Sequence, residues 1–178
     1  MKYSPIDILL GTLKTCLLLI FLEIFTTAFL PSIGIDNFKP AFSVLIVLFL
    51  AFKFEHPFLP FLILITQYVH AIFSIEGWAI GTLAGVLISL SLRYLKDLLD
   101  FSTAISTIIV VQIFQLVWFV VISVMLSIKL GTFASFFSIF WKYVPESFVL
   151  SILSPLFFIL LNKFWKVGSD NSASGVSI

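Results

Sequence analysis

The sequence predicts an all-α integral membrane protein, a bundle of about six transmembrane helices, and three observations lead to this fold class. Of the 178 residues, 61% are hydrophobic, and the mean hydropathy is +1.20. Charged residues make up only 11%, against about 25% in soluble domains. Apolar stretches close to the roughly 17–25 residues that a bilayer requires follow one another along the chain. Because a soluble domain of this length could not bury so much apolar surface, we expect lipid to be the solvent.

The first three predicted spans cover residues 8–30, 40–54 and 57–75. The first is longer than the apolar region of a signal peptide and contains Glu23, so we interpret it as a retained span. The second opens on Pro40, a residue type favoured in the first turn of a helix, and it is short for a bilayer.

The last three predicted spans cover residues 77–95, 101–128 and 147–164. We expect Pro155 to kink the sixth span, because proline removes a helical hydrogen bond. Residues 167–178 are small and polar, a composition that predicts a disordered cytoplasmic tail.

Residues 129–146 lie between the fifth and sixth spans and are predicted to form an interfacial, extracytoplasmic segment. Phenylalanines recur in it at helical spacing, and Trp141 and Tyr143 suit the headgroup region. Two interpretations are open: a ledge on which a partner docks, or a connector that rests on the membrane.

The distribution of lysine and arginine orients the bundle, because these residues are enriched in cytoplasmic loops. Seven of them fall on the side of the two termini and three on the other side. The seven are Lys2, Lys14, Lys53, Arg93, Lys96, Lys163 and Lys166, and the three are Lys39, Lys129 and Lys142. This bias predicts that both termini are cytoplasmic.

Small residues recur at every fourth position of the fourth span, at Gly77, Gly81, Gly85 and Ser89. Hydrophobicity does not draw helices together in lipid, whereas small residues allow close backbone packing. The stripe is therefore a predicted helix-packing or partner face, formed either with another helix of this chain or with the span of a partner.

Ionisable and amide side chains inside the spans are functional hypotheses by default, because they are costly in lipid. Glu23 and His70 lie at similar depth, roughly 8–10 Å below the outer boundary at 1.5 Å per residue, and Gln67 lies one turn from His70. We expect these side chains to face the interior and Glu23 to contact His70. They form either a ligand or proton site or a polar pair that fixes packing.

Two further polar groups are expected. Gln112 and Gln115 stand three residues apart near the middle of the fifth span, and we expect interhelical hydrogen bonds from them. A charged cytoplasmic face follows the fourth span, where Arg93–Asp97 and Lys96–Asp100 are spaced as helical ion pairs.

The sequence gives little basis for catalysis or metal binding. No HExxH, CxxC, GxSxG or P-loop pattern is present, so no enzymatic activity and no cofactor are expected. The net charge of +1 provides no basic face for nucleic acid. The two histidines are far apart in sequence, and the single cysteine, Cys16, cannot form an internal disulfide.

Three segments of the chain carry a resemblance to a known family. They are FKPAFSVLIVLFLAFKFEHP, HAIFSIEGWAIGTLAGVLISLSLRYLK and VPESFVLSILSPLFFILLNKFWK. The first resembles the basic-Pro entry into the second span of the rod-shape-determining MreD family. The second resembles that family's third-to-fourth hairpin, and the third resembles its last span, with an internal proline and a basic finish.

The resemblance implies a non-enzymatic scaffold in the bacterial cytoplasmic membrane, within the complex that elongates the cell wall. MreC-like protein is the implied partner, with MreB, a RodA-like glycosyltransferase and a class B penicillin-binding protein as further partners. On this reading the glycine stripe is a candidate partner face, and Arg93 and Lys96 face the cytoplasmic filament.

An alternative is the substrate-binding S-component of an energy-coupling-factor vitamin transporter, a similar architecture of six spans. Glu23, Gln67 and His70 would then line a pocket near the outer face. Those subunits usually dock through small residues at four-residue spacing on the first span, where this sequence has only Gly11 and Thr15.

Overall fold

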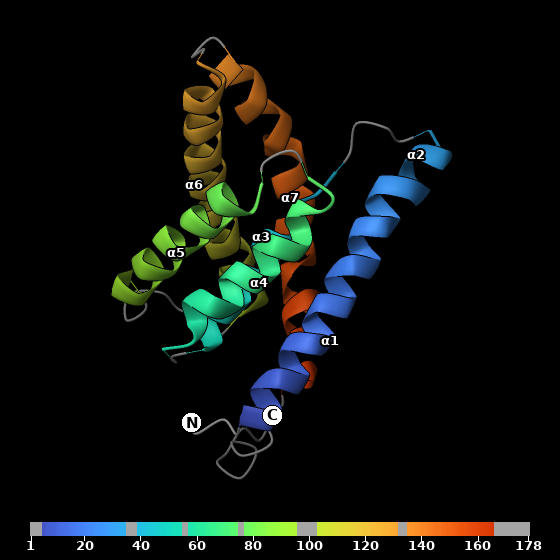
Figure 1. Ribbon diagram of the computed structural model, residues 1–178, viewed down its shortest axis with the longest axis vertical. Helices are drawn as coiled ribbons and strands as arrows, with labels where there is room; N and C mark the ends of the chain where they lie inside the picture. Colours follow the sequence, from blue (N-terminus) through green and yellow to red (C-terminus); the bar gives the residue numbers. More distant parts are fainter. Residues whose placement is uncertain are drawn as a thin grey trace.

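The computed structural model describes residues 5–34, 39–54, 57–74, 77–95, 103–131 and 135–165. All regular secondary structure within these ranges is helical (Figure 1), so the predicted all-α fold class is confirmed. Four helical stretches are long and apolar enough to cross a membrane, judged by length and composition. The chain is therefore a membrane protein.

The first long stretch runs from Pro5 to Ser32 and changes its winding midway. Helix α1 (Pro5–Ile24) continues through the π-helix η1 (Phe25–Phe29) into the short α2 (Leu30–Ser32). The Leu30 N–H bonds to the Phe25 carbonyl, as π-helical winding requires. The hydroxyls of Thr26 and Thr27 donate to the Glu23 carbonyl at 3.1 and 2.6 Å.

Two short helices, α3 (Phe42–Lys53) and α4 (Leu59–Ala71), occupy the second and third predicted spans. Ten of the twelve residues of α3 are buried, and α3 contacts α1, α4, α5, α6 and α7. A helix that is apolar on all sides requires such a central position. Helix α3 is therefore the core around which the longer helices pack.

The three remaining helices are α5 (Trp78–Leu95), α6 (Ala104–Leu130) and α7 (Ser135–Phe164). Thr103 caps α6 by accepting a hydrogen bond from the Ser106 N–H at 3.1 Å. Gly131 ends α6 with φ +69°, a left-handed conformation that favours glycine.

Helix α7 covers the last predicted span and part of the segment predicted to be interfacial. It runs without interruption from Ser135 through Pro145 and Pro155 to Phe164, and the interfacial position of residues 129–146 stays a prediction. A proline inside a helix removes one hydrogen bond and bends the helix without necessarily ending it. The Ser154 hydroxyl donates to the Ser151 carbonyl at 2.7 Å, which gives a partner to the group that Pro155 cannot bond.

The helices alternate in direction along the bundle. The start of α1 and the end of α7 lie at one end of the molecule, and the connection between α6 and α7 lies at the other (Figure 1). Large apolar side chains are exposed on the outer faces, including Leu9, Leu87, Ile113 and Ile152. Such an exterior fits a lipid environment.

Candidate functional site

The predicted contact between Glu23 and His70 is present. His70 Nδ1 lies 2.6 Å from Glu23 Oε1, and the two side chains are only 9% and 6% exposed. Glu23 is the last of four buried residues at four-residue spacing on α1, after Gly11, Thr15 and Leu19. His70 belongs to the buried face of α4. The pair therefore joins α1 to the bundle below the surface.

The chemistry of this contact is a single short, charge-assisted or proton-sharing hydrogen bond. A carboxyl and an imidazole with one proton between them satisfy each other. In a low-dielectric interior, the loss of either group leaves the other buried without that bond. The π-helix η1, which begins two residues after Glu23, is a form often found at functional sites.

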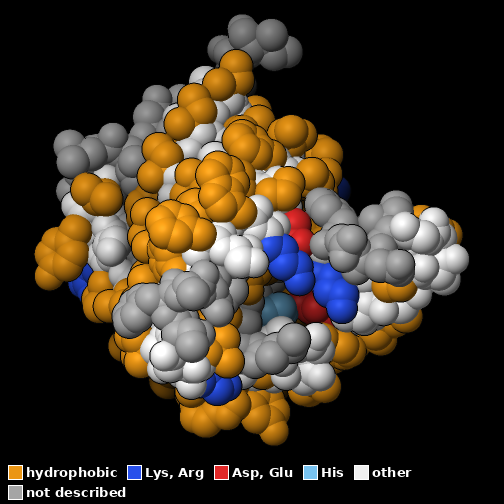
Figure 2. Space-filling model, turned by 90° about the horizontal axis from the view of Figure 1, so that it is seen from above, with side chains coloured by type: hydrophobic (Ala, Val, Ile, Leu, Met, Phe, Trp, Pro, Cys, Tyr) orange, Lys and Arg blue, Asp and Glu red, His pale blue; other side chains and the backbone are white. Residues whose placement is uncertain are grey.

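Further polar groups lie near the pair. Gln67 is one turn before His70 on α4 and is 1% exposed. Its Nε2, like the Ser74 hydroxyl, is buried and has no hydrogen-bond partner among the described residues. Figure 2 shows the end of the molecule where α6 and α7 connect, with a hollow that has a histidine side chain at its floor and charged side chains around it. His70 is the one histidine in the described ranges, since His56 lies outside them.

The predicted glycine stripe divides into two parts. A Cβ on Gly85 would lie 2.6 Å from Ile63 Cγ2 of α4 and 3.3 Å from Trp118 Cη2 of α6, and a Cβ on Gly81 would meet the Gln67 side chain. These two glycines therefore pack inside the chain. Ser89 is buried with them, and its hydroxyl donates to the Val86 carbonyl at 2.8 Å.

Gly77 lies outside the face that packs within the chain, and its predicted contact with a partner stays a prediction. It precedes α5 with φ +81°, and nothing lies within 4 Å of the position of an added Cβ. Its role is to begin α5 in a conformation that other residues rarely adopt.

The two glutamines of the fifth predicted span behave differently. Gln112 Nε2 donates to the Ser147 hydroxyl at 2.9 Å and joins α6 to α7. Gln115 is fully buried, and neither of its amide atoms has a partner within the described part of the chain. The expected interhelical hydrogen bond is therefore made by the first glutamine and not by the second.

The charged face after the fourth predicted span is only partly described. Arg93 is exposed near the end of α5. Lys96, Asp97 and Asp100 lie outside the described residues, so their predicted ion pairs remain predictions.

Two interhelical contacts were not predicted from the sequence. Trp165 Nε1 donates to the Thr15 hydroxyl at 3.0 Å, and the indole covers Gly11, where an added Cβ would lie 2.8 Å from Trp165 Cε3. Glu146, 2% exposed, accepts a hydrogen bond from the Lys39 N–H at 3.1 Å. Gly11 and Thr15 four residues apart were a signal for the first contact, whereas nothing in the sequence paired Glu146 with position 39.

Among the described residues, no group of three or more histidine, cysteine, aspartate or glutamate side chains could hold a metal ion. The site is thus a set of buried polar contacts, together with a few buried amide and hydroxyl groups that have no hydrogen-bond partner among the described residues. Comparison of the sequence and fold with protein-family models, with curated proteins and with solved structures found no match.

Proposed function

We propose that this protein is a non-enzymatic membrane scaffold of the bacterial cell-wall elongation complex, which maintains rod shape by binding a MreC-like protein. MreB, a RodA-like glycosyltransferase and a class B penicillin-binding protein are the further partners in this proposal. The protein resides in the cytoplasmic membrane with both termini in the cytoplasm. The sequence resemblance to the MreD family is the source of these partners.

One observation about the interior carries the scaffold role. Several of its buried polar side chains join separate segments of the same chain: Glu23 to His70, Gln112 to Ser147, Trp165 to Thr15, and Glu146 to the Lys39 backbone. The amides of Gln67 and Gln115 are not fully used in this way within the described residues. Polar groups used in this way fasten helices together. A rigid bundle whose outer faces meet other membrane proteins needs an interior of this kind.

Two glycines of α5 are covered by other helices of the same chain, which limits the surface on which a partner can bind. Gly81 and Gly85 are covered by side chains of α4 and α6, so partners of the scaffold meet the exposed side of α5 instead. Leu83, Leu87 and Leu90 form part of this exposed side.

The proposal is tested by depleting the protein in its host while cell shape and complex assembly are followed. The expected result is rounding of the cells, together with loss of the MreC-like protein from pull-downs of the elongation transpeptidase. Re-expression of the wild-type chain should restore both. Depleted cells that keep their rod shape and an intact complex would contradict the proposal.

The S-component function stays as a second candidate because of one observation. The hollow in Figure 2 lies over a histidine, and the buried Gln67 Nε2 and Ser74 Oγ have no partner among the described residues. A small polar ligand could use these groups. Uptake of a labelled vitamin that fails on depletion, with normal cell shape, would favour this candidate over the scaffold.

A further inference from the structure

The helices that face outward differ greatly in length. At 1.5 Å per residue, the 28 residues of Pro5–Ser32 and the 27 residues of α6 extend about 40 Å, whereas the 13 residues of α4 extend about 20 Å. The hydrocarbon core of a typical bilayer is about 30 Å thick. The long helices exceed this thickness, and α4 falls short of it.

The shortness of α4 matters because α4 faces outward. Helix α3 is equally short, but it is buried on all sides. By contrast, Phe61 and Tyr68 of α4 are each 59% exposed and Ile72 is 69% exposed. Figure 1 shows α4 in front of α3, between α1 and α5. An apolar outer face of this kind fits a lipid environment.

The two ends of α4 cannot lie in hydrocarbon. Helix ends carry backbone N–H and C=O groups without intrahelical partners, and lipid offers these groups no hydrogen bonds. The sequence also has Glu55 and His56 in the connection before α4 and Glu76 in the connection after it. The helix between these connections is about 10 Å shorter than the hydrocarbon core.

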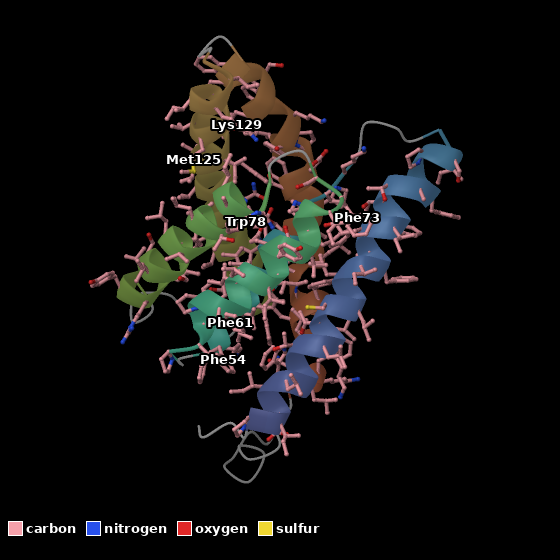
Figure 3. The ribbon with its side chains drawn as sticks, viewed as in Figure 1. Phe54, Phe61, Phe73, Trp78, Met125 and Lys129 are labelled. Atoms are coloured by element: carbon pink, nitrogen blue, oxygen red, sulfur yellow. The ribbon has the colours of Figure 1, made fainter. Side chains whose placement is uncertain are left out.

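A step in height is visible at one end of the molecule. In Figure 3, Phe73 and Trp78, at the turn between α4 and α5, lie well below Met125 and Lys129 of α6 along the long axis. A groove of about 440 Å³ lies at this step, between Gly77–Ile80 on one side and Met125, Ile128 and Lys129 on the other. Tryptophan and lysine are both residue types that anchor helices at the membrane boundary.

We infer that the bilayer thins against the α4–α5 hairpin, so that the leaflet boundary steps down across this groove from Lys129 to Trp78. Phospholipid of the thinned leaflet is the occupant of the groove and of the exposed face of α4. Thinning is a known response to a short apolar stretch, and here it is confined to one side because α1, α6 and α7 are long. This inference rests on membrane residence alone and does not depend on the scaffold function.

The depth of Trp78 tests the inference. The full-length protein is reconstituted in oleoyl phosphatidylcholine vesicles that contain lipids brominated either near the headgroup or near the chain end. The difference in fluorescence between wild type and Trp78→Phe isolates the Trp78 signal. Lipids brominated near the headgroup (shallow bromines) are expected to quench the Trp78 fluorescence at least twice as strongly as lipids brominated near the chain end (deep bromines).

Trp141, 65% exposed near the start of α7, provides the matched control through Trp141→Phe, since its helix is long. If deep bromines quench Trp78 more strongly, the bilayer does not thin and the inference is wrong. If neither lipid quenches Trp78 while Trp141 responds, protein covers this face, either a second copy or a partner, and the inference is equally overturned.

Discussion

Helix α4 is joined to two of its neighbours, α5 and α1, by different means. Toward α5, close packing depends on glycine. Because Gly81 and Gly85 have no side chain, the side chains of Gln67 and Ile63 can approach the α5 backbone. Toward α1, the two helices share a buried hydrogen bond between His70 Nδ1 and Glu23 Oε1. Lipid provides no hydrophobic force between helices, so the first junction is sensitive to added volume and the second to the loss of a polar atom.

The largest effect is expected for Gly85→Leu. A Cβ at this position already lies 2.6 Å from Ile63 Cγ2, and the remaining atoms have no space beside Trp118. Overpacking of a filled interior costs about 1–3 kcal/mol for modest insertions, so Gly85→Ala should fall in that range and Gly85→Leu should exceed it. Unfolding in mixed detergent, followed by circular dichroism, measures the loss.

A smaller effect is expected for His70→Ala, which removes one partner of the α1–α4 contact. The Glu23 carboxyl then stays buried without this bond, at a cost of about 1–3 kcal/mol. The double variant Glu23→Ala/His70→Ala should be less destabilised than the sum of the two single variants. Additive losses in the same unfolding assay would show that the two side chains act independently.

Substitutions at Gly77 distinguish the cost of an unfavourable backbone conformation from the cost of overpacking. The φ of +81° strains any other residue, by about 1–2 kcal/mol for a left-handed conformation, but the space around it is open. Gly77→Leu should therefore destabilise no more than Gly77→Ala, in contrast to the steep increase expected at Gly85. A larger loss for leucine at position 77 would mean that this glycine does face a neighbouring helix.

The smallest effect is expected for Thr15→Val, which keeps the side-chain shape and removes the acceptor for Trp165 Nε1. Interhelical hydrogen bonds in membranes contribute about 0.6 kcal/mol on average. Thr12→Val is the matched control, because the Thr12 hydroxyl bonds to the Ile8 carbonyl of its own helix. Equal apparent unfolding free energies for the two variants would argue against the Trp165 contact.

Composition and depth along the spans were sufficient to predict the helical membrane fold and the contact of Glu23 with His70. Spacing alone could not separate Gly77 from Gly81 and Gly85, because the same four-residue interval continues across the start of a helix. The aromatic residues at helical spacing in 129–146 predicted an interfacial segment, but this pattern could not show that α7 begins within it, at Ser135. The burial of α3, which places it at the core, depends on contacts from five other helices that no local pattern records.

The contacts of Glu146 and Trp165 were harder still to predict. Each joins residues more than a hundred positions apart, and each partner is unremarkable by itself. A backbone N–H at Lys39 carries no signal in sequence, and Gly11 with Thr15 indicates only that something packs closely on α1.

Native mass spectrometry of the protein purified in mild detergent tests the central claim most directly, because it weighs bound proteins and bound small molecules in one spectrum. The proposed scaffold function predicts a complex with a MreC-like protein and no small molecule in stoichiometric amount. A spectrum dominated by the chain with one tightly held nutrient, without any wall-elongation protein, would contradict the account.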